Sequence, residues 1–286
     1  MPTRPGRAPR SYRYLLGDAR HESARLRAQA RLWDPTAFTL FDRLGIRRGW
    51  RVLEVGPGQG SLHVELRRRV RGPVDAVEPS AVFRSRIRQL SARDGFGRGQ
   101  VWEAPLAESA LPRRTYDLIF VRWVFLFLPK PEQHVRQLVA ALKPGGLLAI
   151  EDYRRETLSM IPCPPEFAAF LGADAAFFAT QGGDASIAGR LPAMFERAGL
   201  EVIDVTPTIK TGHPGSPVWN WLSTYFLGVM DQLGRLPPFT PAQAASLRRQ
   251  WIANARKPTS LLIGPTLIDV VGRRPRRKRR ATEATD

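Results

Sequence analysis

The stretch Arg51-Val-Leu-Glu-Val-Gly-Pro-Gly-Gln-Gly60 decides the fold of this chain. Its first half has strand character from Val52 to Val55, and it runs directly into three glycines spaced two apart. Such a turn lets main-chain N–H groups approach a ligand closely, and the helix expected over Leu62 to Val70 directs its positive end at the same place. Glu54 is a carboxylate in an apolar strand, so it requires a cation or several donors nearby. The stretch therefore predicts a site for a ligand that carries an ammonium group and no pyrophosphate.

The dinucleotide-binding fingerprint G-x-G-x-x-G is the main competing interpretation of this turn. If Gly56 and Gly58 are its first two glycines, the third falls at position 61, which is Ser61. The segment 73–79 then reads as a second strand that ends in Glu78. An acid at that point is well placed to accept hydrogen bonds from both hydroxyls of a ribose. The alternative interpretation of Glu78 is a solvated strand end.

Strand and helix patterns alternate along the first half of the chain. Residues 116–121 are nearly all apolar, as expected of a central strand. This alternation predicts a parallel sheet covered by helices on both faces. The expected elements are strands over 51–55, 74–77, 100–102, 116–121 and 146–151, and helices over 61–70, 80–92 and 131–142. A helix over 186–198, a strand over 200–205 and a last strand over 261–271 follow.

The segment Val52 to Val124 resembles class I S-adenosylmethionine-dependent methyltransferases. Residues 116–123 are similar to the fourth strand of that family, 142–150 to the loop before its fifth strand, and 261–275 to its last strand. The stretch from Tyr12 to Leu44 resembles the helical lead-in of the branch with ubiquinone- and menaquinone-type and natural-product enzymes. The resemblance implies an α/β fold: a Rossmann-like, mainly parallel seven-stranded sheet closed by an antiparallel pair of strands.

The expected domain organisation follows from these elements. A helical lead-in over 11–45 is expected to break at Trp33-Asp-Pro35 into two helices. About 55 residues between the last two strands are far too many for a hairpin, which predicts a helical cap. The segments are a disordered N-terminus (1–10), the lead-in (11–45), the Rossmann-like core (46–206 and 260–272), the cap or substrate lid (207–259) and a basic disordered tail (273–286).

Composition limits the classes of protein that fit. With 286 residues, 43% of them hydrophobic, the chain can bury a full core, and no apolar run reaches the roughly 18 residues of a membrane span. No secretory signal is recognisable, so a cytoplasmic location is expected. Cys163 is the only cysteine, and no His, Asp and Glu cluster has metal-ligand spacing, so no metal is expected. The net charge of +18 is concentrated partly at the termini, where nucleic-acid binding is possible but a solvated tail is favoured.

The resemblance assigns roles around S-adenosylmethionine. Three glycines would cradle the methionine part, and Glu54 would orient its ammonium. Glu78 would hold the ribose, while Pro79 and Glu103 would lie against the adenine. Arg122 and Trp123 would lie beside the sulfonium, and Arg25 and Gln29 of the lead-in would also contact the cofactor. The full set of expected cofactor-binding residues is Glu54, Gly56, Gly58, Gly60, Glu78, Pro79, Glu103, Arg122, Trp123, Arg25 and Gln29. Arg25 has the alternative interpretation of a charge on a solvated helix.

The side chains of the predicted cap suggest that the molecule that accepts the methyl group is bulky and apolar or aromatic. Val218 to Leu233 has apolar side chains on two helical faces, so it needs two partners, of which one could be a substrate. The expected pocket residues are Tyr14, Phe177, Trp219, Trp221 and Tyr225. A base is needed only for a hydroxyl or an acidic carbon. His213 and Tyr153 are the candidates, Glu151 and Asp152 compete with them, and His63 and His134 are expected on helix surfaces.

The resulting hypothesis is a methyltransferase that acts on a small, hydrophobic or aromatic molecule by in-line displacement. One alternative is an RNA or protein methyltransferase that uses the basic tails; Arg-Trp-Val-Phe at 122–125 replaces the Asn-Pro-Pro-Tyr-like sequence of base-modifying relatives. Another is a non-catalytic regulatory protein that binds S-adenosylmethionine. Ser61 and Glu54 argue against an NAD-dependent oxidoreductase. The acceptor, the methylated atom and the oligomeric state stay open.

Overall fold

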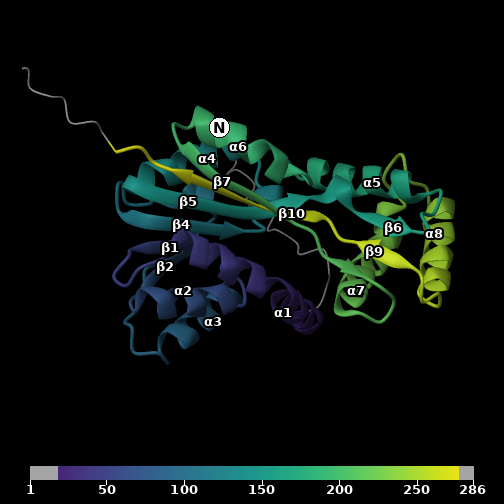
Figure 1. Ribbon diagram of the computed structural model, residues 1–286, viewed down its shortest axis with the longest axis horizontal. Helices are drawn as coiled ribbons and strands as arrows, with labels where there is room; N and C mark the ends of the chain where they lie inside the picture. Colours follow the sequence, from purple (N-terminus) through teal and green to yellow (C-terminus); the bar gives the residue numbers. More distant parts are fainter. Residues whose placement is uncertain (1–18, 277–286) are drawn as a thin grey trace, which may run out of the picture.

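The computed structural model describes the backbone of residues 19–276 and the side chains from Leu26 to Arg276. A seven-stranded sheet with the order β3-β2-β1-β4-β5-β10-β7 forms its centre (Figure 1). Only β10 runs antiparallel to its neighbours, β5 and β7. The strands are β1 (Val52–Val55), β2 (Val74–Val77), β3 (Val101–Trp102), β4 (Tyr116–Arg122), β5 (Leu142–Arg154), β7 (Glu201–Thr208) and β10 (Thr266–Arg273). This arrangement confirms the predicted fold class, including the antiparallel closing pair.

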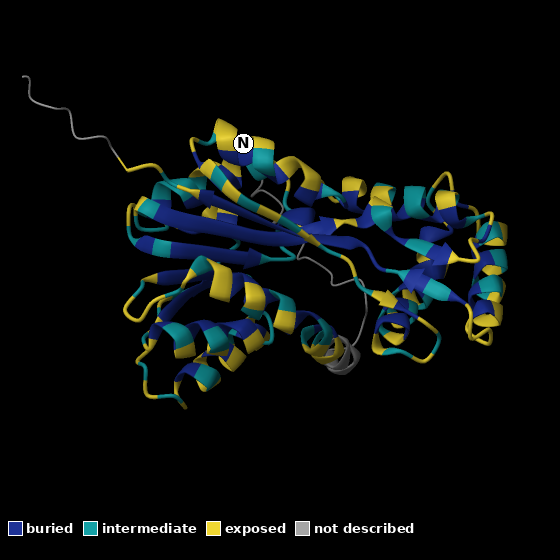
Figure 2. Cartoon of the chain, in the orientation of Figure 1, coloured by how far each residue is buried: buried dark blue, intermediate teal, exposed yellow. Residues whose placement is uncertain are grey.

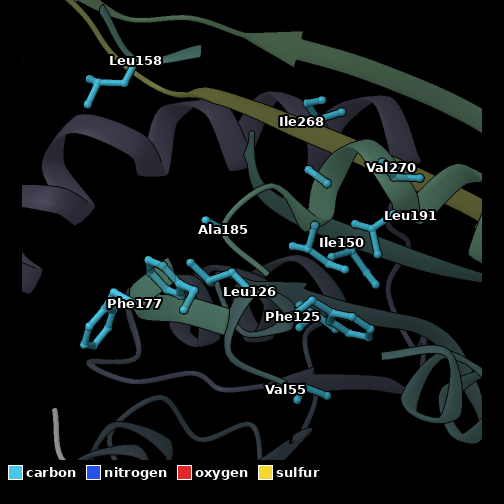
Figure 3. Packing of buried hydrophobic residues seen from close by; sticks show 14 of the residues in the cluster. Val55, Phe125, Leu126, Ile150, Leu158, Phe177, Ala185, Leu191, Ile268 and Val270 are labelled. Atoms are coloured by element: carbon cyan, nitrogen blue, oxygen red, sulfur yellow. The ribbon is translucent and has the colours of Figure 1, made fainter. Parts of the chain in front are cut away.

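Helices cover both faces of the sheet. On one face Phe41 packs edge-on against Phe120, with ring centroids 4.9 Å apart, and Leu66 joins the same apolar cluster. The opposite face holds a larger cluster in which Phe125, Leu191 and Ile150 lie close together (Figure 3). The first face carries α1 (Ala19–Leu44), α2 (Ser61–Val70) and α3 (Ala81–Ser91), and the second carries α4 (Pro131–Ala141) and α6 (Leu191–Arg197). Helix α5 (Phe167–Thr180) lies past the carboxyl end of β5, where Phe170 packs against Phe226. Because both faces are covered, the central strands β1, β2, β4 and β10 are buried almost throughout their length, whereas the edge strand β7 alternates between exposed and half-buried residues (Figure 2).

A cap lies beyond the carboxyl end of β5, at one end of the molecule (Figure 1). It contains a small sheet with the order β6-β9-β8, built from β6 (Ser159–Ile161), β8 (Thr211–Gly212) and β9 (Leu261–Ile263). Two helices complete it, α7 (Pro217–Leu233) and α8 (Pro241–Asn254). The single strand predicted over 261–271 is therefore two strands. The chain turns at Gly264-Pro265, because β9 pairs with β6 and β8 in the cap whereas β10 joins the large sheet.

The part of the lead-in that the structure describes is one helix, Ala19–Leu44, so the predicted break at Trp33-Asp-Pro35 was wrong. Proline removes one backbone donor, but buried contacts on both sides of Pro35 hold α1 together. Trp33 has no exposed surface, and the Asp34 carboxylate accepts a hydrogen bond of 2.5 Å from the Arg122 guanidinium. Four residues later, the Thr39 hydroxyl donates to the Pro35 carbonyl at 3.1 Å. Tertiary packing thus overrides the local helix-breaking signal.

The described chain continues past residue 273, the predicted start of the basic tail, and residues 277–286 of that tail lie outside the described residues. Arg273 is paired within β10, and the Arg274 guanidinium donates to the carbonyl groups of Val139 at 2.9 Å and Leu142 at 2.6 Å. These carbonyls lie at the C-terminal end of α4, where a cation is stabilising. The predicted disordered segment 1–10 lies outside the described residues. Short 3₁₀ helices occupy Leu106–Glu108, Phe125–Phe127, Arg155–Thr157 and Ile187–Arg190. No helix between residues 19 and 276 has the length and apolarity to cross a membrane.

Candidate functional site

The glycine turn after β1 adopts backbone conformations that favour glycine. Gly56, Gly58 and Gly60 have φ angles of 72°, 53° and 82°. A Cβ atom on Gly56 would lie 2.6 Å from Val124 Cγ2, and one on Gly60 would lie 2.7 Å from Leu90 Cδ1. A Cβ on Gly58 would meet nothing within 4 Å. Gly56 and Gly60 therefore allow close packing within the protein, whereas Gly58 leaves open space beside the main chain for a ligand.

Glu78 lies directly beside this turn. Its buried carboxylate accepts hydrogen bonds from the backbone N–H groups of Gly58 at 3.2 Å and Ser80 at 2.9 Å. Burial raises the pKa of Glu78, and the two backbone hydrogen bonds only partly oppose this effect. The structure therefore brings the predicted ribose-binding acid to the open glycine, although the two come from separate strands.

Glu54 is satisfied inside the protein by a histidine. Its carboxylate lies 2.9 Å from His63 Nδ1, and both side chains are almost completely buried between β1 and the first turn of α2. The prediction of a surface position for His63 was wrong. His134 is also buried, and burial lowers its pKa. A strand acid followed by a histidine on the next helix could have suggested the Glu54–His63 pair from the sequence. The contact of Glu54 with a cofactor ammonium stays a prediction.

The acid predicted to meet the adenine follows β3. Glu103 is exposed, and its carboxylate forms ion pairs with Arg88 at 2.5 Å and Arg84 at 3.3 Å, both on α3. Pro79 is also exposed, and its carbonyl accepts a hydrogen bond of 2.6 Å from Arg84. Arg84 thus holds the ends of β2 and β3 together. The adenine contacts of Pro79 and Glu103 stay predictions.

A group of aromatic side chains lies past the carboxyl ends of β4 and β5. Trp123 stacks on Tyr153 with ring centroids 5.6 Å apart, and the Arg122 guanidinium lies 4.3 Å from the centre of the Trp123 ring. Trp33 of α1 packs edge-on against Trp123, Tyr153 and Trp221 of α7 at 5.8 to 6.4 Å. We call Trp33, Trp123, Tyr153 and Trp221 the indole cluster. Since Val124 touches Gly56, this cluster adjoins the glycine turn.

The carboxylates considered as bases have no exposed surface. Glu151 lies with an oxygen 3.9 Å from Arg122 Nε, and burial raises its pKa well above the usual value. Asp152 accepts hydrogen bonds from the backbone N–H groups of Leu126 and Tyr153, and burial raises its pKa to about 7. The Tyr153 ring belongs to the indole cluster. In the part of the chain that the structure describes, no three His, Cys, Asp or Glu side chains could hold a metal ion.

Other predicted residues lie away from this cluster. Phe177 packs against Phe178 in the apolar cluster on the second face of the sheet (Figure 3), and Trp219 is buried in the same cluster. The Tyr225 ring faces the Arg155 guanidinium at 5.1 Å. His213 is exposed, with Nδ1 3.0 Å from the Pro214 carbonyl oxygen. Gln29 is buried in α1, whereas Tyr14 and the Arg25 side chain lie outside the described residues.

Sequence reasoning missed three residues at this edge. Trp33 and Asp34 were interpreted only as a helix break, although a tryptophan at such a position also suggests a buried anchor. Lys210 lies between β7 and β8, and its Nζ atom is 5.0 Å from the centre of the Trp33 ring. An isolated lysine in the connection between two strands gives no sequence signal of its own.

Comparison with known proteins places this arrangement in a family. A family model described as a methyltransferase domain matches residues 22–205. Methyltransferase GfsG of Streptomyces halstedii is 28% identical over 187 residues, which cover 62% of this chain and 62% of that protein. The chain thus matches less than two thirds of the length of this curated relative.

Solved structures share the fold at low sequence identity. Geranyl diphosphate C-methyltransferase from Streptomyces coelicolor A3(2), solved with S-adenosyl-L-homocysteine, has a TM-score of 0.54 and 14% identity, with 91% of this chain and 86% of that chain covered. The [4+2]-cyclase SpnF has a TM-score of 0.55 and 17% identity, with coverages of 85% and 82%. By its match over more than half of its length, the chain belongs to the class I S-adenosylmethionine-dependent methyltransferase family.

Proposed function

We propose that this protein transfers the methyl group of S-adenosylmethionine to a small apolar or aromatic acceptor. The observation that carries the proposal is the position of the indole cluster directly beside the glycine turn, through the contact of Val124 with Gly56. The glycine turn and Glu78 offer backbone and carboxylate groups to the cofactor, and the neighbouring indole cluster offers aromatic surface to the acceptor. Methyl transfer needs such a pairing of a polar donor site with an acceptor site.

The residues at the turn fit the cofactor. Gly58 leaves space beside its main chain, and the Glu78 carboxylate lies within reach of the same space with lone pairs for two hydroxyl groups. The N-terminus of α2 has no acidic residue in its first turn and no side-chain cap, so its N–H groups face the turn. When bound, S-adenosylmethionine supplies a methyl group that is already activated for displacement.

The protein's contribution to the reaction is positioning and exclusion of water. Trp123, Tyr153 and Trp33 form a dry wall next to the turn, which favours a fixed orientation of a flat acceptor. The Tyr153 hydroxyl is the candidate to hold or accept an acceptor proton, because its ring lies within this wall. His213 is exposed, so a role as base would require the β8–α7 loop to approach the acceptor.

Calorimetric titration with S-adenosylmethionine, S-adenosylhomocysteine and NAD tests the proposal. We expect the first two ligands to bind and NAD not to bind. Glu78→Ala should weaken binding by about 10- to 100-fold, because it removes hydrogen bonds to a charged group. Asp117→Ala is the matched control, since Asp117 lies at the amino end of β4 and pairs with Lys143 at 2.7 Å. Absence of binding by the folded wild-type protein would overturn the proposal.

A second assay separates methyl transfer from other chemistry on this fold. The neighbouring [4+2]-cyclase structure shows that the fold alone does not specify the reaction. Production of S-adenosylhomocysteine in the presence of candidate aromatic acceptors would demonstrate transfer. Binding of the cofactor without turnover across a broad panel would instead favour the non-catalytic or regulatory alternative.

A further inference from the structure

The indole cluster has an unusual hydrogen-bonding state. The Nε1 atoms of Trp33, Trp123 and Trp221 are buried, and none has a hydrogen-bond acceptor among the described residues. By contrast, Trp251 in the cap donates from Nε1 to the Ser223 hydroxyl at 2.8 Å. Buried polar groups in folded proteins almost always have a partner, so three unpaired donors in one cluster require an explanation. The simplest explanation is a ligand that brings acceptors.

A cation without a counter-ion lies at the same place. Lys210 Nζ is 5.0 Å from the centre of the Trp33 ring, and no carboxylate between residues 26 and 276 pairs with it. Arg122 also contacts the cluster, but its charge is met by Asp34 at 2.5 Å. Lys210 is therefore a positive charge at the cluster that no carboxylate of the described residues pairs with. A ligand with negative charge would satisfy both Lys210 and the indole donors.

The backbone of the cluster also has a mark of a functional site. Trp123 has a φ angle of 54°, which is rare for a bulky residue. Such strain persists where the surrounding structure fixes it, and it gathers at binding and catalytic sites. The conformation directs Trp123 onto Tyr153 and leaves the next residue, Val124, against Gly56. The unpaired donors are thus held beside the cofactor turn.

We propose that the indole cluster and Lys210 bind the acceptor substrate through an oxyanion, such as a carboxylate or phenolate attached to a flat apolar body. This inference rests on the proposed function and adds the chemical class of the acceptor. The aromatic faces pack against the apolar body, the indole N–H groups donate to the oxygens, and the Lys210 ammonium supplies the opposite charge. Because Lys210 favours an ionised acceptor, it also reduces the need for a strong protein base.

Two ligands of the same shape test the charge preference. The probes are 2-naphthoate, which carries a carboxylate at neutral pH, and 2-naphthamide, which is neutral, each titrated calorimetrically with and without S-adenosylhomocysteine. We expect 2-naphthoate to bind at least about tenfold more tightly. Titration of 2-naphthol with rising pH then distinguishes a phenolate from a carboxylate site. Equal affinities for naphthoate and naphthamide, or no binding of naphthoate at millimolar concentration, would overturn the inference.

Variants of Lys210 and of the indole cluster test whether these residues cause the preference for naphthoate over naphthamide. Lys210→Met should remove the preference for naphthoate while naphthamide binding stays within about twofold, and Lys210→Arg should retain it. Trp221→Phe removes one indole donor and should reduce the preference several-fold. Trp251→Phe is the matched control, because it removes a paired indole in the cap and should leave the preference unchanged. A preference that survives Lys210→Met contradicts the inference.

The two proposals fail in distinguishable ways. Binding of S-adenosylhomocysteine is measured on the same wild-type sample. If it binds and naphthoate shows no preference, only the oxyanion site is disproved. If it does not bind, the methyltransferase proposal falls, while the titration without it still tests the oxyanion site directly.

Discussion

Three buried acids at the carboxyl ends of the strands are satisfied in different ways. Glu54 meets an imidazole, Glu78 meets two backbone N–H groups, and Asp152 accepts hydrogen bonds from the backbone of the loop after β4. Burial opposes ionisation, so the pKa values of Glu78 and Asp152 are raised in spite of these donors. Perturbed acids gathered at one edge of a sheet are a common property of functional sites.

Asp152 should make stability depend on pH. Its folded-state pKa is about 7, against 3.8 for an exposed aspartate, so the folded state binds the proton more tightly. Stability should therefore fall as the pH rises from about 4 to 7 and then level off. The raised pKa of Asp152 corresponds to a pH-dependent contribution on the order of 4 kcal/mol to the free energy of unfolding. Asp152→Asn should remove this contribution to the pH dependence of the unfolding free energy.

Urea unfolding of both proteins between pH 4.5 and 8 measures the effect. Other carboxylates titrate in the same range, so the informative quantity is the difference in unfolding free energy between wild type and variant at each pH. A constant offset is expected in addition, because the amide group introduced by the substitution would face a backbone donor. Parallel pH profiles would show that Asp152 has an ordinary pKa.

Whether a site residue could be predicted from the sequence depends on whether it belongs to a local sequence pattern. Gly58 and Glu78 were predictable, because a glycine turn and an acid at the end of the next strand have local patterns. The Glu54–His63 pair and the contact of Lys210 with Trp33 depend on side chains that the fold brings together from separate elements. The Glu54–His63 pair lies within one strand–turn–helix segment, so a local pattern could have suggested it, whereas the contact of Lys210 with Trp33 joins distant parts of the chain and has no local pattern.

Among the elements, periodicity predicted the strands of the large sheet well and the cap poorly. β4 has a continuous apolar run, whereas β6, β8 and β9 have two or three residues each, too few for any periodic pattern. The segment from Leu261 reads as one strand because its apolar residues continue across Gly264-Pro265. Pairing partners from elsewhere in the chain, Ser159–Ile161 and Thr211–Gly212, decide that it divides.

Helix α1 allows a direct test of how tertiary contacts keep a helix continuous across a proline, which would otherwise interrupt it. Pro35→Ala restores a backbone donor inside the helix, where proline costs about 3 kcal/mol relative to alanine. The unfolded chain gains entropy in the variant, which offsets about 0.4–1 kcal/mol. We therefore expect a net gain in unfolding free energy of about 2 to 2.6 kcal/mol, measured by urea denaturation.

The functional readout of the same variant is cofactor binding. If the proline only interrupts a hydrogen bond, affinity for S-adenosylhomocysteine stays within about twofold of wild type. A destabilised variant would show instead that Pro35 is needed to place Trp33 and Asp34 against β4. Thr39→Val, which removes the hydroxyl that donates to the Pro35 carbonyl, is a suitable companion variant.

On the scale of the whole molecule, the chain passes between the large sheet and the cap more than once, because β7 of the large sheet lies in sequence between β6 and β8 of the cap. β5 leads into the cap through Arg154, and the chain returns from β9 to β10. The indole cluster joins the two parts, since α1 supplies Trp33 and α7 supplies Trp221. Arg155 adds a second connection, with its guanidinium bonded to Asp174 at 2.7 Å and facing aromatic rings of α5 and α7. We infer that the cap and the core unfold together.

Ligand binding at the glycine turn should then stabilise the molecule as one cooperative unit. S-adenosylhomocysteine at 100 times its dissociation constant should raise the unfolding free energy by about 2.7 kcal/mol. For a chain of this size, the midpoint of thermal unfolding should rise by about 5–10 °C in a single transition. Glu78→Gln, assayed at the same ligand concentration, should lose most of the shift, and the control Asp117→Ala should keep it. Two separate transitions, of which the ligand moves only one, would show that the cap unfolds independently and that its contacts through Trp33 and Trp221 are weak.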